Sequence, residues 1–135
     1  TTTMKKSLLL ALLALATGMS FFACEKDKHD HEAEITILSP TAGQTFSLNQ
    51  TVSIQADITS EEELHGWEIT LKKKSDNTVL YTTDEHTHGT SLQIREQWVN
   101  NVTAHTDVVL EVKVALDHTS SETKTATVEF HCHPN

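Results

Sequence analysis

The chain has 135 residues, of which 19 are acidic and 10 are basic, giving a formal net charge of −9 at pH 7. An acidic surface repels phosphate groups, so this charge argues against nucleic acid and anionic lipid headgroups as partners. The length suits one domain that can bury a core without disulfide bonds.

The N-terminal 24 residues have the pattern of an export signal. A pair of lysines, an apolar run over residues 8–18 and the small residue Ala23 precede Cys24. This stretch resembles the signal peptide of bacterial lipoproteins, in which the cysteine after the cleavage site receives the lipid. The resemblance extends no further along the chain, and Phe21 stands where this family usually has leucine.

The resemblance implies that residues 1–23 are a signal peptide, with extra threonines before Met4, and that a lipid on Cys24 anchors the protein to a membrane. It implies a cell-envelope location, as an outer-membrane lipoprotein that is either periplasmic or surface-exposed. Without Lys5 and Lys6 the chain keeps eight basic and 19 acidic residues, a formal charge of −11. A buried N-terminal helix with an unmodified Cys24 is the alternative.

Two kinds of segment follow. Residues 24–33 are mostly charged or histidine and lack apolar periodicity, which predicts a flexible tether. Over residues 34–135, apolar and polar residues alternate in short runs, which predicts an all-β sandwich. The seven expected strands cover residues 34–38, 51–58, 65–73, 78–83, 106–116 and 123–131, with one more beginning at residue 91. Residues 96–101 fit a helical turn as well as a continuing strand.

Several features of this region resemble bacterial immunoglobulin-like and fibronectin type III-like domains. They are the opening sequence of residues 37–43, the alternation around Val52 and Ile54, and Trp67 in the third strand. The resemblance implies a seven-stranded antiparallel immunoglobulin-like sandwich. The paired cysteines of antibody domains are missing, and we interpret Trp67 as a core aromatic. Such domains mostly bind, space or present other molecules.

Catalytic motifs are missing from the sequence. No serine, cysteine or threonine stands in a nucleophile motif, and the four glycines form no phosphate-binding loop. We therefore assign no catalytic residue and expect a binding protein rather than an enzyme. If Cys24 carries a lipid, Cys132 has no partner for a disulfide within the chain.

Histidine is the residue type that suggests a ligand. Nine histidines follow Cys24, and six of them form His-X-His pairs. In an extended segment residues i and i+2 face the same way, so each pair can present two imidazoles to one ion. The nine are His29, His31, His65, His86, His88, His105, His118, His131 and His133.

The up-and-down strand order predicts where these histidines gather. The connections after the second, fourth and sixth expected strands should lie at one end of the sandwich, where the tether with His29 and His31 also enters. Their histidines are the predicted ligands of a zinc or copper ion. These ligands are His65, His86, His88 and His118.

A second, less favoured metal site is the C-terminal sequence His131-Cys132-His133 at the other end, with His105 nearby. In a regular strand Cys132 faces away from both histidines. Only a frayed terminus would let all three bind one soft ion such as copper(I).

The alternative to metal binding is that the histidines are ordinary solvated side chains. The protein would then be an adhesion or glycan-associated accessory module, with a protein or glycan partner that the sequence does not identify. Exposed aromatic side chains would favour glycan binding. Trp98 is the best candidate for such a side chain, followed by Tyr81.

The lipid anchor can be tested by replacing Cys24 with Ala. The variant should lose its acyl anchor and stay uncleaved, because the modified cysteine is the only site to which the lipid is expected to attach. Incorporation of labelled palmitate measures this directly. Equal labelling of the variant and the wild type would show that the lipoprotein assignment is wrong.

Overall fold

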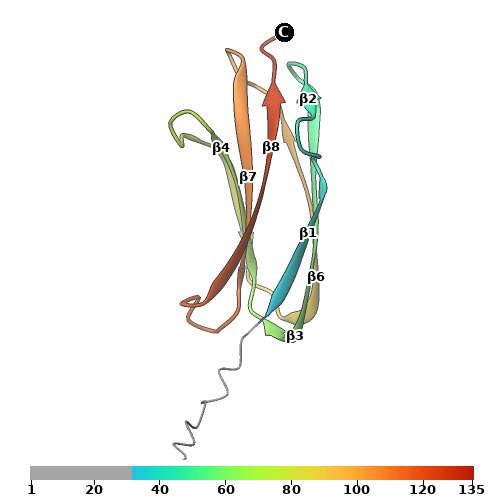
Figure 1. Ribbon diagram of the computed structural model, residues 1–135, viewed down its shortest axis with the longest axis vertical. Helices are drawn as coiled ribbons and strands as arrows, with labels where there is room; N and C mark the ends of the chain where they lie inside the picture. Colours follow the sequence, from blue (N-terminus) through green and yellow to red (C-terminus); the bar gives the residue numbers. More distant parts are fainter. Residues whose placement is uncertain (1–31) are drawn as a thin grey trace, which may run out of the picture.

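The computed structural model describes residues 32–135, which form two β-sheets packed face to face (Figure 1). The expected signal peptide, Cys24, and residues 24–31 of the expected tether, with His29 and His31, lie outside the described residues. The tether was expected to extend to residue 33, but Ala33 is buried and begins the first strand. Within residues 32–135 no helix is long and apolar enough to cross a membrane. The expectation of an all-β fold built as a sandwich is confirmed.

Eight strands build the two sheets over the described part of the chain. The first sheet has the order β1-β3-β6 and the second has the order β2-β8-β7-β4-β5. All neighbouring strands run antiparallel except β2 and β8. The bounds are β1 (Ala33–Ser39), β2 (Thr45–Phe46), β3 (Thr51–Leu64), β4 (Trp67–Lys73), β5 (Val79–Glu85), β6 (Gly89–Val99), β7 (Thr106–Ala115) and β8 (Thr123–Cys132).

The expected count of seven strands is wrong because β2 is an additional strand. It has two residues and pairs in parallel with the end of β8. Phe46 is buried and meets Phe130 edge to face, with ring centroids 5.4 Å apart, so the segment is held against the sheet by its apolar side chain. A strand of two residues is too short to show an alternating pattern.

One further expectation about a strand end is wrong, and the open alternative for another is decided. Residues 59–64, expected as a loop, belong to β3, which resumes pairing with β6 after a register shift between Thr59 and Leu64. Residues 96–101, left undecided, continue β6 as far as Val99. Trp98 is only 7% exposed and belongs to the core, so it is not the exposed aromatic that glycan binding would require. Tyr81 is half-buried and packs on the same core.

The core lies between the sheets and is built from alternate residues of the strands. The inward residues of the central strands β3 and β7 are completely buried, which is the expected consequence of period-two alternation. Each valine, leucine or isoleucine among them contributes about 1.5–3 kcal/mol on transfer from water. They are Val52, Ile54, Ala56, Ile58, Val108, Leu110, Val112 and Val114.

Asn100 is the one polar residue buried completely within residues 32–135. Its Nδ2 donates to the backbone oxygens of Ser47 and His133, each at 2.9 Å, and to that of Phe46 at 3.3 Å. Its Oδ1 accepts from the backbone nitrogen of Val102. One amide side chain therefore joins β2, the chain after β6 and the end of the chain after β8.

Replacing Asn100 with Ala should lower the free energy of unfolding by about 1–3 kcal/mol, because buried carbonyl groups would lose their donor. Chemical denaturation of the purified protein measures this change. Asn101→Ala is the matched control, since Asn101 is exposed and its loss should cost less than about 0.5 kcal/mol. Equal stability of the two variants would contradict the role given to Asn100.

Candidate metal-binding sites

The structure brings the four predicted histidines together at the end of the sandwich where β1 begins. His65 follows β3, His86 and His88 follow β5, and His118 lies between β7 and β8. Ring centroids are 3.9 Å apart for His65 and His118, 5.1 Å for His65 and His88, and 4.9 Å for His86 and His88. With Glu63 these residues are the near-end cluster.

Donor atoms converge most closely around His88. Ligand atoms of Glu63, His65 and His88 all lie within 4.8 Å of one another, which is close enough for one metal ion to bind them. His88 Nδ1 lies 2.9 Å from Glu63 Oε1, and since an ionised carboxylate only accepts, the imidazole donates. His88 Nε2 then carries the lone pair, and it faces His86 Nε2 at 3.2 Å. An ion bound at His88 Nε2 would have His86 as a second ligand and Glu63 as the carboxylate that orients His88, whereas an ion bound between Glu63 and His88 Nδ1 would displace the proton from Nδ1.

His65 differs from its neighbours in the environment of its ring. Its Nδ1 is buried and is the one such side-chain atom in residues 32–135 without a hydrogen-bond partner. Burial lowers the pKa of His65 below the ordinary 6.5, and the rings of His118 and His88 lower this pKa further. His65 therefore stays neutral, the form that binds metal, to a lower pH than an ordinary histidine.

Two local features of the chain set the position of His65. Glu63 and His65 share a face because the buried Leu64 between them points into the core. Gly66 has φ +133° and lies against β5, where an added Cβ would come within 2.5 Å of Glu85 O. Glycine at this position lets the residues after β3 approach the end of β5, where His86 begins the next connection.

The β7–β8 connection that carries His118 is organised by Asp117. The Asp117 carboxylate accepts from the backbone nitrogen of Ser121 at 2.9 Å and from the Thr119 hydroxyl at 3.2 Å. The Ser121 hydroxyl donates to it as well, and this side-chain hydrogen bond is the main reason that the pKa of Asp117 is lowered. The loop is thereby folded back so that His118 contacts His65.

Solvent reaches the near-end cluster from two sides. One hollow of about 250 Å³ is lined by His65 and His86 together with Trp67. A second, of about 400 Å³, is lined by His65 and His118 together with Glu63. His65 lies between the two hollows, so an ion can reach the cluster without an opening of the core.

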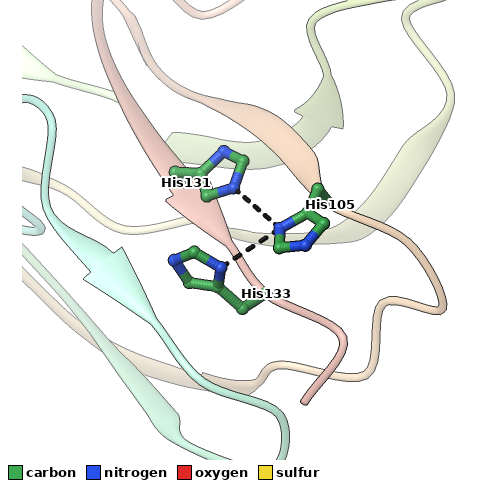
Figure 2. A group of neighbouring side chains, drawn as sticks. All are labelled: His105, His131 and His133. Carbon is green, nitrogen blue, oxygen red and sulfur yellow. Dashed lines mark hydrogen bonds between the residues drawn. The ribbon is translucent and has the colours of Figure 1, made fainter.

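The opposite end of the sandwich holds a second group, the far-end cluster of His105, His131 and His133 (Figure 2). The expected site His131-Cys132-His133 is corrected here. The β8 strand stays regular through Cys132, so the thiol points into the core and has no exposed surface. His105 takes the place that the sequence interpretation gave to Cys132.

Two candidate ligands were not predicted from the sequence. Glu63 was not assigned as a ligand, although its i, i+2 spacing from His65 indicates a shared face. His105 was placed at the far end but was not grouped with His133, because that grouping depends on the register of β7 against β8. The spacing of Glu63 and His65 can be read from the sequence, whereas the register of β7 against β8 cannot.

Comparison with known proteins assigns no family, because no protein-family model matches the chain and no curated protein gives a significant match. Function is therefore inferred from the geometry of the two clusters.

The buried position of Cys132 predicts a thiol that does not react in the folded protein. Burial raises the pKa of Cys132 to about 11, and the thiolate is the reactive form. Reaction with Ellman's reagent at pH 8 should be slow in buffer and fast in denaturant. Equal rates under the two conditions would show that the strand end is frayed and that Cys132 is available as a ligand.

Proposed function

We propose that this protein is a lipid-anchored binding protein of the cell envelope whose immunoglobulin-like domain binds a zinc or copper ion at the near-end cluster. The anchor rests on the resemblance of the first 24 residues to lipoprotein signal peptides. Metal binding rests on Glu63, His65, His86 and His88, with His118 packed against His65. No catalytic role is part of the proposal.

The strand order supports an immunoglobulin-like domain. Immunoglobulin constant domains place strands A, B, E and D in one sheet and strands C, F and G in the other. Here β1, β3 and β6 correspond to A, B and E, and β4, β7 and β8 correspond to C, F and G. The β5 strand departs from this pattern because it pairs with β4 rather than with β6.

The observation that carries the metal assignment is that ligand atoms of Glu63, His65 and His88 lie within 4.8 Å of one another. His65 also has a buried Nδ1 without a hydrogen-bond partner, and such an atom costs about 1–3 kcal/mol, so a folded protein normally supplies a partner. A cation bound at this nitrogen would provide that partner. Imidazole nitrogens with one carboxylate are a ligand set that suits zinc and copper(II).

The alternative function is that of an adhesion or glycan-associated module, and the aromatic residue that favoured it is not exposed. Trp98 packs in the core, so its ring is not available to stack on a sugar. Metal binding is the function with more support from the described residues.

Zinc titration by calorimetry tests the near-end site. We choose a His105→Ala background so that the far-end cluster does not contribute heat. Replacing His86 and His88 with Ala in this background should weaken zinc binding by more than about 100-fold. Loss of a residue that only hydrogen-bonds to a ligand costs up to about 100-fold, so a larger loss indicates that the ligands themselves were removed. The matched control is Thr87→Ala, since Thr87 lies between the two histidines and carries no imidazole.

The same titration should depend on pH. Lowering the pH through about 6.5 protonates ordinary imidazoles, so protons compete with the ion and zinc affinity should fall. Because the pKa of His65 is lowered, protons should compete less for His65 than for an ordinary imidazole. No zinc-dependent heat at pH 7.5 would exclude metal binding at the near end.

A further inference from the structure

The far-end cluster lies at the end of the molecule opposite the near-end cluster and shares no residue with it. Its geometry follows from the antiparallel pairing of β7 with β8. In that register Asp107 lies opposite His131, and continuing the ladder by one pair beyond Thr106 and Cys132 places His105 opposite His133. Side chains at directly opposite positions have Cβ atoms about 4.5–5.5 Å apart. The ladder therefore gathers all three imidazoles on the outer face of the sheet.

The ring nitrogens of the three histidines have the spacing of metal ligands (Figure 2). His105 Nδ1 lies 3.1 Å from His133 Nδ1 and 3.4 Å from His131 Nε2. Zinc binds imidazole nitrogen at about 2.0–2.1 Å, so two ligands on a tetrahedral ion are about 3.3 Å apart. Both measured separations are close to this value.

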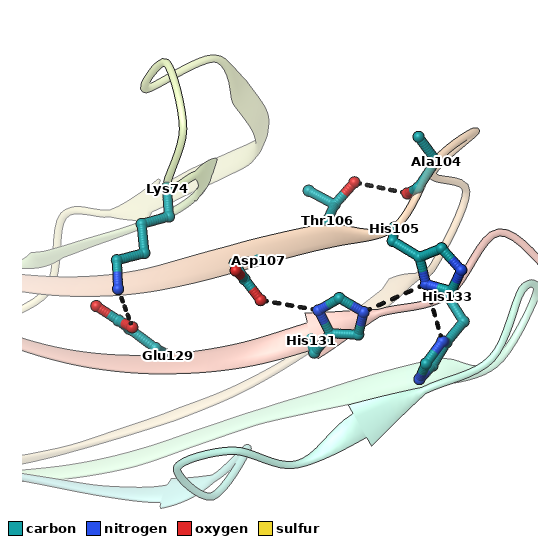
Figure 3. Close-up of polar contacts among 8 residues, drawn as sticks. All are labelled: Lys74, Ala104, His105, Thr106, Asp107, Glu129, His131 and His133. Carbon is teal, nitrogen blue, oxygen red and sulfur yellow. Dashed lines mark hydrogen bonds and ion pairs between the residues drawn. The ribbon is translucent and has the colours of Figure 1, made fainter.

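The convergence of the three ring nitrogens is explained better by a bound ion than by hydrogen bonds among the rings. His131 Nδ1 lies 2.8 Å from Asp107 Oδ1, and because the carboxylate accepts, the lone pair of His131 is on Nε2 (Figure 3). His105 Nδ1 thus faces that lone pair and also His133 Nδ1. If His105 Nδ1 carries a proton, that single proton must serve both contacts, and if His133 Nδ1 donates instead, the lone pairs of His105 Nδ1 and His131 Nε2 face each other without a proton. One cation can bind all three nitrogens.

The protein backbone holds two of the three histidines in place. The backbone nitrogen of His131 donates to Gln44 O at 2.9 Å, and that of His133 donates to Phe46 O at 2.8 Å. The carbonyl of His133 accepts from Asn100, which is completely buried. The site therefore needs little rearrangement to bind an ion.

We propose that His105, His131 and His133 form a second site for a divalent transition metal ion, with zinc or copper(II) as the ion, independent of the near-end site. Asp107 is a positioning residue that orients His131 through its Nδ1, as carboxylates commonly do for metal-bound histidines. The three donors differ from the near-end set because none of them is a carboxylate. An ion with three imidazole ligands keeps a fourth position for water or an external ligand. His105 is exposed, so solvent reaches the cluster.

Zinc stoichiometry of the full chain in mild detergent tests the proposal. After saturation and dialysis, elemental analysis should find two ions in the wild type and one in His105→Ala. It should also find one in the double variant with His86 and His88 replaced by Ala, and none when all three changes are combined. Glu129→Gln is the matched control on the outer face of β8, and it should keep two ions.

The outcomes separate the two sites. One ion in the wild type that is lost with His105→Ala would leave the far-end site standing and overturn the near-end function. One ion that is lost with the His86 and His88 changes would overturn the far-end proposal. Loss of His105 should not unfold the protein because its side chain is exposed, and unchanged far-ultraviolet circular dichroism verifies this.

Asp107→Asn tests the positioning role. In the variant that lacks His86 and His88, this change should weaken zinc binding by about 10–100-fold, since an amide can orient His131 in either tautomer. The thermal midpoint without metal should stay unchanged. Restored affinity in Asp107→Glu would support a carboxylate requirement, whereas unchanged affinity in Asp107→Asn would exclude Asp107 from the site.

Discussion

Burial of the inward faces of β3 and β7 between the two sheets is the constraint from which the rest of the structure follows. Their inward positions are aliphatic and have no exposed surface. A charged or strongly polar group at these positions would cost several kcal/mol unless it found a partner. The histidines of the described chain are thereby confined to outward positions and to the connections at the two ends. Because side chains alternate along a strand, the histidines lie outside the core that the same strands build.

The two ends position their imidazoles by different means. At the near end the ligands come from three separate connections, so their geometry depends on the close approach at Gly66 and on the loop that Asp117 organises. At the far end His131 lies in β8, while His105 and His133 lie one residue beyond the paired ends of β7 and β8, where Asn100 donates a hydrogen bond to the His133 carbonyl. A ladder of backbone hydrogen bonds defines distances more tightly than loops do. The far-end cluster is accordingly the smaller but the more regular of the two.

The sequence was informative where a signal is local. Alternation identified β7 and its buried face, and the strand order was enough to bring His65 close to His118. The sequence was uninformative where a structure depends on contacts between residues that are far apart in the chain. The β2 strand exists because Phe46 packs on Phe130, and the grouping of His105 with His133 depends on a cross-strand register. Neither relation leaves a periodic pattern in the chain.

The alternation of His131, Cys132 and His133 has a consequence for the ligands that this strand offers. The two imidazoles stand on the outer face of β8 while the thiol between them points into the core. An ion held by these imidazoles, as proposed above, would have the sulfur on the opposite face of the strand, and burial keeps the thiol protonated. The thiol could therefore not become a ligand of that ion unless the end of the strand opened. The pleat of a single strand thus decides that the ligands offered on this face are imidazoles alone.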